Sequence, residues 1–471
     1  MKNLLPLLTA AFLFFTSSTR AELRAGAAQV VISPPDGVNL AGYYNFRGSD
    51  GVLDDIHSRA LVLEDGATRA ALVTLDLIGT PRELVEAVRA EVEKSGVLPG
   101  GHVMISATHA HTGPVPGRFL RTPDGPESGA PAPDSVHAKY LATLPGLIAA
   151  SVTQAAAKLA PVSLSGASGE CPDLAFCRRF YMRDGKVGWN PGKLNPNTMT
   201  PAGPTDPQVQ AIFFEAPHKP AERVDALAIY ANFSMHPDTV GGTKISADYP
   251  GALARLMAGY HGKECITLYG NGTCGNLNHI DVAWDRQQKG AEEAHRIATL
   301  LTASVFRAEK KQRNLAAGAL RVKSVMVPMD VPDVSPEQAE MARETVRRKT
   351  AGPPPTFMQL VHANRLLDLA PREGKPIDAE VQVITLGRDV AWIGLPGEVF
   401  VELGLALKKQ SPFPHTIITT LTNGNWGYLP DRRSYAEGAY EAESSRVEPG
   451  SGEKLVEAAA RMLAELHAAA K

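Results

Sequence analysis

Side chains that can bind a metal ion follow several apolar runs of this 471-residue chain. His109 and His111 come after the run at 103–106 and precede Thr112-Gly113-Pro114, which predicts a tight loop. Residues two apart on an extended chain point to the same side, so both imidazoles could share one metal ion. Alternatively, one could bind the ion while the other meets a substrate. An isolated pair of this kind is a weak signal, because such histidines also occur without a metal.

Three further candidates lie in the second half of the chain. His236 follows the apolar run 226–233, where a lone histidine is more commonly a satisfied core residue. Glu398 follows the Gly-Leu-Pro-Gly turn at 394–397, and the alternative there is a solvent-facing glutamate at a helix start. Tyr428 ends an Asn-Trp-Gly-Tyr segment, with core packing as its alternative role.

Together these residues indicate one kind of chemistry. Two histidines and a glutamate that leave one coordination position open are a catalytic zinc pattern. Zinc lowers the pKa of a bound water towards ~7 and so provides a nucleophile at neutral pH. Amide hydrolysis needs such a nucleophile, together with donors for the developing oxyanion. The sequence therefore predicts a Zn2+-dependent hydrolase.

Apolar strand patterns and helical patterns alternate along the chain. This alternation predicts an α/β fold, with a mixed β-sheet core, flanking helices and the active site at strand ends. A Pro- and Asn-rich segment, 189–207, is expected to be irregular and to shape the binding site. We expect strands at 30–33, 60–63, 70–75, 103–106, 162–165, 209–214, 226–233, 266–269, 322–331, 380–386, 390–395 and 417–421. Two hairpins are expected among them, one that turns at Asp65-Gly66 and one that turns at Gly387-Arg388. We expect helices at 83–94, 137–159, 249–259 after an Asp248 cap, 337–369 with a break at 352–355, and 454–466.

The first 21 residues predict a cleavable export signal. Lys2 provides a positive charge, 4–15 provides a short apolar stretch, and Ala21 is a small residue suited to cleavage. The remaining 22–471 is expected to be one catalytic domain, secreted or periplasmic. No later stretch of about 18 uninterrupted apolar residues occurs, so no transmembrane segment is expected. The net charge of -2 argues against a nucleic-acid partner.

The four cysteines form two pairs that are close in sequence, Cys171 with Cys177 and Cys265 with Cys274. Export would permit disulfides, whereas four free, buried thiols fit the sequence equally well. No Cys-x-x-Cys spacing occurs, which argues against a cysteine-based zinc site.

Beyond these patterns, the chain resembles the neutral, non-lysosomal ceramidases and their shorter bacterial relatives. The resemblance spans roughly 25–466. Its most specific motifs are Thr-His-x-His-x-Gly-Pro at 108–114 and Pro-Gly-Glu at 396–398, with Tyr428 and Tyr440 at matching spacing. The matching segments are 42–44, 55–61, 106–114, 178–179, 270–278, 395–398 and 422–442.

The resemblance implies a role for each matching residue. His111 and Tyr440 would hydrogen-bond the scissile carbonyl and its oxyanion. Arg178 would bind the substrate, although Arg179 beside it leaves the register open. The substrate would be a small-molecule or lipid N-acyl compound. The zinc ligands would be His109, His236, Glu398 and Tyr428.

Two departures from the family pattern are visible. The ceramidases carry an active-site serine in a Gly-Asp-Val-Ser-Pro-Asn-like loop, whereas 275–279 here reads Gly-Asn-Leu-Asn-His and places Asn278 at the serine. An amide can donate a hydrogen bond but cannot act as a nucleophile. Chemistry through a zinc-activated water is therefore still expected, with Asn278 as a further oxyanion donor, but cleavage of ceramide itself is in doubt. The C-terminal immunoglobulin-like domain of full-length ceramidases is also expected to be absent.

Two alternatives remain open at this point. The same site could hydrolyse an ester or a lactone, because an activated water attacks any of these carbonyls. The chain could also be an exported binding protein that kept the fold and lost turnover, and Asn278 favours that reading.

Overall fold

The computed structural model describes residues 22–43, 47–117, 132, 134–217, 225–316, 318–348 and 352–470. The predicted export signal, 1–21, lies outside the described residues. The described chain forms a mixed α/β fold, which confirms the predicted fold class.

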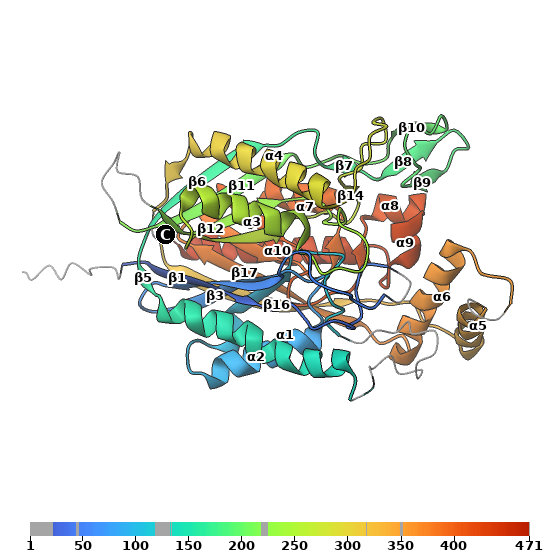
Figure 1. Ribbon diagram of the computed structural model, residues 1–471, viewed down its shortest axis with the longest axis horizontal. Coiled ribbons are helices and arrows are strands. Elements are labelled where there is room, and N and C mark those ends of the chain that lie inside the picture. Colours follow the sequence, from blue (N-terminus) through green and yellow to red (C-terminus); the bar gives the residue numbers. More distant parts are fainter. Residues whose placement is uncertain are drawn as a thin grey trace, which may run out of the picture.

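The first sheet has the strand order β4-β3-β2-β1-β5 and is antiparallel except for the pair β3–β4. The predicted hairpin across Asp65 and Gly66 is confirmed as β2–β3. Helices α1 and α2 pack on one face of this sheet and form a shared apolar core with it (Figure 1). The elements are β1 (Arg24–Val31), β2 (His57–Glu64), β3 (Arg69–Leu75), β4 (Val103–Ala107), β5 (Ala160–Pro161), α1 (Arg82–Lys94) and α2 (Val136–Ala157).

The second sheet has the order β13-β12-β11-β6-β15, with β12 and β13 parallel. Helices α3 and α4 cover it on the side away from the first sheet (Figure 1). Its elements are β6 (Ser163–Glu170), β11 (Gln208–Glu215), β12 (Ala226–Phe233), β13 (Ile266–Asn271), β15 (Arg313–Asn314), α3 (Asp248–His261) and α4 (Ala291–Glu309).

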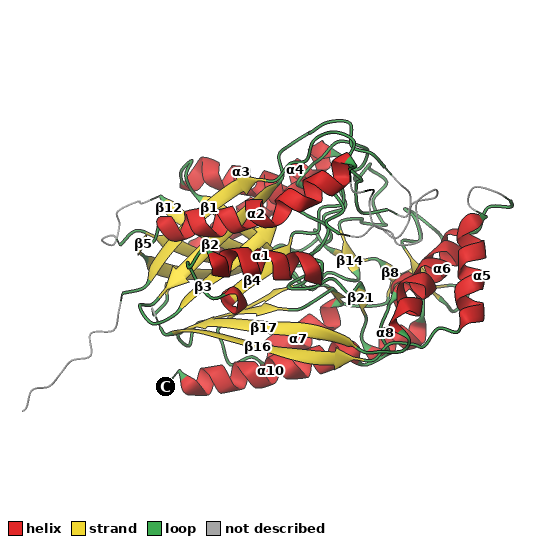
Figure 2. Ribbon diagram, turned by 90° about the horizontal axis from the view of Figure 1, so that it is seen from below, coloured by secondary structure: helices red, strands yellow, loops and turns green. Residues whose placement is uncertain are grey.

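The third sheet has the order β16-β17-β18-β20, with β18 and β20 parallel, and packs against α7 and α10 (Figure 2). The predicted hairpin at 380–395 is confirmed as β17–β18. A central apolar cluster joins all three sheets, with Leu72, Tyr230 and Trp392 among its members. The elements are β16 (Leu320–Met329), β17 (Ile377–Leu386), β18 (Val390–Gly394), β20 (His415–Thr419), α7 (Val401–Gln410) and α10 (Ser451–Ala469).

Short elements gather at one end of the three sheets, on the right of both Figure 1 and Figure 2. They carry four of the site residues that sequence analysis singled out, Asn278, Glu398, Tyr428 and Tyr440. They are β7 (Phe176–Cys177), β8 (Arg179–Met182), β9 (Val187–Trp189), β10 (Thr198–Pro201), β14 (Leu277–Asn278), α5 (Pro336–Arg347), α6 (Phe357–Leu369), η2 (Ala370–Arg372), β19 (Glu398–Val399), β21 (Tyr428–Leu429), α8 (Arg432–Glu437) and α9 (Tyr440–Ser444). The short helix η1 (Gly100–His102) instead precedes β4, at the opposite end of that strand from His109.

Some local predictions differ from the structure. Helices α4 and α7 were not predicted, and the segment expected to be irregular contains β10. The predicted Asp248 cap is wrong. Asp248 is the first residue of α3, and its carboxylate instead accepts hydrogen bonds from the backbone N–H groups of Thr239 and Val240, each at 2.8 Å. It therefore fixes the loop that follows His236.

The four cysteines are free and buried, so the thiol alternative holds. One described helix, α2, is long and apolar enough to cross a membrane by length and composition alone, which the sequence analysis did not anticipate. Its Leu144, Ile148 and Val152 pack in the core of the first sheet, as in an ordinary buried helix.

Candidate functional site

The predicted metal-binding side chains come together where strands of all three sheets end. His109 follows β4, His236 follows β12, and Glu398 follows β18. Backbone hydrogen bonds link these ends through Leu421, which follows β20: Ala107 N–H donates to the Leu421 carbonyl at 3.3 Å, and Leu421 N–H donates to the Gly397 carbonyl at 3.1 Å. The side chain of Asn271 adds a hydrogen bond to the Thr108 carbonyl at 3.2 Å. The structure thus places these side chains together at strand ends.

Backbone carbonyls fix the orientation of two of the imidazoles. His109 Nδ1 lies 2.6 Å from the Ile78 carbonyl oxygen, and His236 Nδ1 lies 2.8 Å from that of Cys274. Because a carbonyl oxygen only accepts hydrogen bonds, each Nδ1 must carry the proton. Each Nε2 of a neutral ring then presents a lone pair. His109 holds this position with a left-handed backbone, φ 76°.

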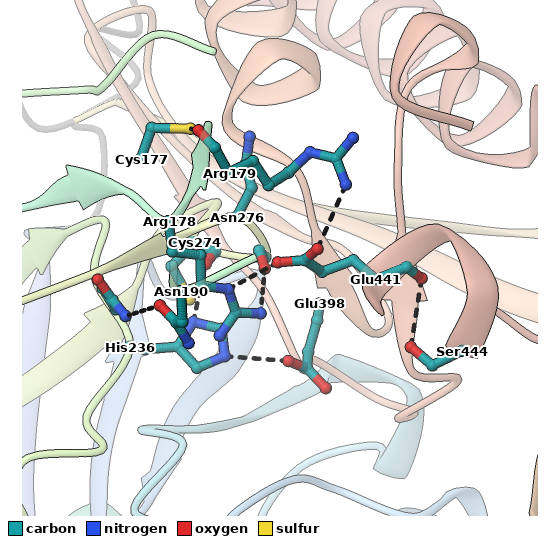
Figure 3. Close-up of polar contacts among 12 residues, drawn as sticks. Cys177, Arg178, Arg179, Asn190, His236, Cys274, Asn276, Glu398, Glu441 and Ser444 are labelled. Carbon is teal, nitrogen blue, oxygen red and sulfur yellow. Dashed lines mark hydrogen bonds and ion pairs between the residues drawn. The ribbon is translucent and has the colours of Figure 1, made fainter. Parts of the chain in front are cut away.

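Both Nε2 atoms face the same carboxylate oxygen. His236 Nε2 is 3.1 Å from Glu398 Oε2, and His109 Nε2 is 3.4 Å from it (Figure 3 shows the His236 contact). The third imidazole is equally close, with His111 Nε2 3.2 Å from His109 Nε2. His109, His111 and His236 form a buried cluster whose ligand nitrogens lie within 4.8 Å of one another. These acceptor atoms would repel one another without a cation between them, so the cluster fits a bound metal ion.

The protonation states suit the same role. Burial lowers the pKa of His111 to about 4, despite the nearby Asp238 charge. Burial, helped by the Arg178 charge, lowers the pKa of His236 to about 3. Both rings are therefore neutral at pH 7, and the neutral imidazole is the form that binds metal ions.

Glu398 and Tyr428 are held side by side by a short parallel strand pair. In β19–β21 the two residues are direct partners, and Glu398 N–H donates to the Gly427 carbonyl at 2.8 Å. Gly397 has φ 104°, and a Cβ there would lie 2.7 Å from the Gly427 oxygen, so the turn requires glycine. The Tyr428 ring stacks beside the His236 ring at 6.5 Å between centroids. Burial raises the pKa of Tyr428 well above its usual range, so the phenol carries its proton.

Arg178 and Arg179 share one buried carboxylate, that of Glu441 (Figure 3). Arg178 Nε donates to Glu441 Oε1 at 2.8 Å, and its Nη2 donates to the Gly275 carbonyl at 2.7 Å. Arg179 Nη1 lies 3.3 Å from Glu441 Oε2. The Arg178 guanidinium also lies 5.3 Å from the centroid of the Tyr428 ring. Arg178 is thus near the cluster, but it is not among the described residues that line the cavity.

A cavity of about 440 Å³ opens onto the cluster. Its volume suits a small organic ligand. Tyr440, the first residue of α9, lies on its wall with its ring 5.4 Å from that of Tyr428 and 4.3 Å from that of Trp189. The site residues on the wall are His109, His111, Glu398, Tyr428 and Tyr440.

Asn278 lies away from the cavity wall as the described residues define it. Its Nδ2 donates to Asn190 Oδ1 at 3.0 Å, and its Oδ1 accepts from Ile280 N–H at 3.1 Å. These bonds tie the 275–280 loop to the segment after β9. The structure brings the other seven predicted site residues around the cluster but leaves Asn278 at its edge.

Two residues of the site had no role assigned from sequence. Asp238 Oδ1 lies 3.5 Å from His111 Nδ1 and accepts a hydrogen bond from the Tyr43 hydroxyl at 2.9 Å. Gly42 permits this contact, because a Cβ there would lie 2.6 Å from the His111 carbonyl oxygen. The available signals were weak: Asp238 lies two residues after His236, and Tyr43 lies in a segment that resembles the ceramidases.

Comparison with known proteins agrees with this geometry. No protein-family model matches the chain, and no curated protein matches it. The crystal structure of neutral ceramidase from Pseudomonas aeruginosa is similar to it, with a TM-score of 0.71 and 18% identity, covering 95% of this chain and 75% of that one. A structure described as ceramidase complexed with C2 has a TM-score of 0.69 and 18% identity, covering 95% and 76%. The chain therefore has the ceramidase-family fold, as the sequence resemblance implied.

Proposed function

We propose that this protein is an exported, zinc-dependent hydrolase that cleaves a linear N-acyl amide bond. The observation that carries the proposal is the convergence of two carbonyl-oriented imidazoles and one carboxylate oxygen at the end of the cavity. The similarity in fold to solved neutral ceramidases supports a hydrolase that acts on amides. The predicted signal at 1–21 is the basis for export.

The ligand atoms favour zinc over calcium and magnesium. His109 Nε2, His236 Nε2 and the Glu398 carboxylate would hold the ion, with the Tyr428 oxygen beside them as a fourth group. Two imidazoles with one carboxylate suit zinc, whereas calcium and magnesium prefer sites made of oxygen alone. Zinc, when bound, supplies an activated water at neutral pH and polarises the scissile carbonyl.

In this proposal His111 is the general base and then the general acid. The Asp238 carboxylate beside Nδ1 favours a proton on that nitrogen, which leaves Nε2 of His111 as an acceptor on the cavity side. His111 would take a proton at Nε2 from the attacking water and, once charged, hydrogen-bond the oxyanion and pass the proton to the leaving nitrogen. Tyr440 would donate its hydroxyl proton in a hydrogen bond to the same oxyanion. One water is consumed, the C–N bond breaks, and an acid and an amine leave.

In this proposal Arg178 and Asn278 hold other parts of the site in place and do not contact the reacting atoms. Arg178 would hold the Tyr428 ring and the Gly275 loop in place. Asn278 would fix the same loop, whose Cys274 carbonyl orients His236. No step then requires the serine that Asn278 replaces.

Metal analysis together with a substrate panel tests the proposal. We expect about one zinc per chain, and amidase activity on N-acyl amines that a chelator abolishes and zinc restores. Matched esters assayed in parallel would show whether the amide is preferred. His109→Ala should lose the metal and the activity, whereas the exposed His295→Ala is the control and should keep both. Absence of stoichiometric metal, or normal zinc binding by His109→Ala, would overturn the assignment.

A further inference from the structure

The cavity wall carries one cation that no carboxylate neutralises. Arg372, at the end of η2, lines the same cavity as His109 and Glu398. Its guanidinium carbon lies 5.4 Å from the centroid of the Trp426 ring. Within the described part of the chain, its side chain makes no hydrogen bond and no ion pair.

The contact with Trp426 leaves the N–H donors of Arg372 without a hydrogen-bond partner among the described residues. A cation–π contact is electrostatic and does not use up the N–H donors of the guanidinium. Those donors form a fork that matches a carboxylate. The other guanidinium of the outer wall, Arg446, is already bound by Asp368, with one N–H···O distance of 2.8 Å. Glu83, a further carboxylate on the wall, forms no ion pair with Arg372.

Arg372 is close enough to the metal-binding cluster for one molecule to contact both. Trp426 is two residues before Tyr428, so their Cα atoms are at most roughly 7 Å apart. The cavity that joins them, about 440 Å³, is continuous from His109 to Arg372. An elongated ligand held at the cluster by its carbonyl would therefore extend past Trp426 towards the guanidinium.

We infer that the cavity selects N-acyl substrates that carry an anionic carboxylate, which the Arg372 guanidinium binds. This inference rests on the proposed function and names the substrate class of the same site. The carboxylate could belong to the amine portion, as in an N-acyl amino acid, or to the far end of the acyl portion. In both cases Arg372 recognises the charge while the cluster acts on the amide.

Two sets of substrates matched in length show whether the bound carboxylate belongs to the amine portion or to the acyl portion. The amine-side arm compares dodecanoylglycine, dodecanoyl-β-alanine and dodecanoyl-6-aminohexanoate with the corresponding amino-alcohol amides. The acyl-side arm compares the mono-ethanolamide of dodecanedioic acid with dodecanoylethanolamine. We expect a preference of about tenfold in kcat/KM for the charged member of one arm, as for a charge-assisted hydrogen-bonded pair.

The test variant is Arg372→Gln. It should reduce that preference to near one and leave kcat/KM for the neutral amides unchanged. Arg372→Lys should restore only part of the preference, because an ammonium lacks the planar fork. Arg388→Gln, at the exposed β17–β18 turn, is the control and should behave as wild type. Melting temperatures would show that each variant is folded.

Equal rates on charged and neutral amides in the wild type would overturn the inference and leave the hydrolase proposal intact. The same would follow if Arg372→Gln kept the preference. If no amide is hydrolysed, the proposed function fails, and calorimetric binding of dodecanoylglycine to metal-free protein still decides the subsite. Binding that is about tenfold weaker in Arg372→Gln than in wild type would support the anion site, whereas equal binding would refute it.

Discussion

Glu398→Gln should stabilise the metal-free protein, although it removes a buried carboxylate from the centre of the site. Without a cation, the Glu398 carboxylate faces the Nε2 lone pairs of His109 and His236 at 3.4 and 3.1 Å. A glutamine of the same shape places an amide N–H there, which can donate to one of these nitrogens. One repulsive contact then becomes a neutral hydrogen bond, worth about 1 kcal/mol.

The same substitution at Glu441 should instead destabilise the protein. Glu441 is fully buried and accepts from Arg178 at 2.8 Å and from Arg179 at 3.3 Å. Glu441→Gln would leave the buried Arg178 guanidinium without its hydrogen-bonded counter-charge and Arg179 with Glu437 alone, at 3.2 Å, which costs about 3 kcal/mol. The two isosteric changes thus form a matched pair, in which the environment of each carboxylate decides the outcome.

Differential scanning calorimetry in excess chelator measures both effects. An unfolding entropy of about 2.1 cal/mol/K per residue implies a shift of about 1 °C per kcal/mol for a chain of this length. We expect a rise of about 1 °C for Glu398→Gln and a fall of about 3 °C for Glu441→Gln. Zinc titration should show affinity lowered at least about 100-fold by Glu398→Gln, because a charged ligand is lost. A lower melting temperature for metal-free Glu398→Gln would mean that the imidazoles donate to the carboxylate, and the reasoning on lone pairs would be wrong.

Three further predictions concern the residues around the cluster. Asp238→Asn should lower kcat about 10- to 100-fold with zinc content unchanged, because the carboxylate that orients His111 is lost; an unchanged kcat in steady-state assays would remove Asp238 from the mechanism. Tyr440→Phe should lower kcat/KM about 100-fold, as for loss of one oxyanion donor, while atomic absorption shows normal zinc; a variant with wild-type turnover would refute that role. Asn278→Ala should lose about 1–2 kcal/mol of stability in chemical denaturation and keep most of its turnover, because its side chain bonds to the loop; complete loss of activity in a folded variant would instead assign it to the chemistry.

The spacing of apolar and turn residues predicted the strands and helices of the core well, because such spacing depends only on neighbours in sequence. The alternation in β2 and β3 with a turn at Asp65-Gly66 was enough to predict their hairpin. Helix α4 was missed although Ile297, Leu301 and Val305 recur every four residues and are buried, so its signal was present in the sequence. Asp248 was assigned as a cap because its position before a helix suits one, whereas the loop after His236 takes its carboxylate.

The site was predictable in its composition but not in its contacts. His109, His236 and Glu398 each follow a strand, and strand ends meet at one edge of the fold. The pairing of Tyr43 with Asp238 spans 195 residues, and no spacing rule connects them. The same holds for Asn278, whose bond to Asn190 depends on how two loops pack. Such contacts depend on the tertiary arrangement, which a single sequence does not display.

The ion pairs of Arg178 and Arg179 with Glu441 also constrain when this part of the protein can fold. The two cations precede their counter-charge by 263 and 262 residues, so a nascent chain carries them long before the carboxylate exists. Until the C-terminal stretch is made, packing the arginines inside would bury unopposed positive charge. We therefore expect this region to stay open to water until the chain has been made as far as residue 441. An unfolded chain is also the form that a secretion channel accepts, so this late closure is compatible with export before folding.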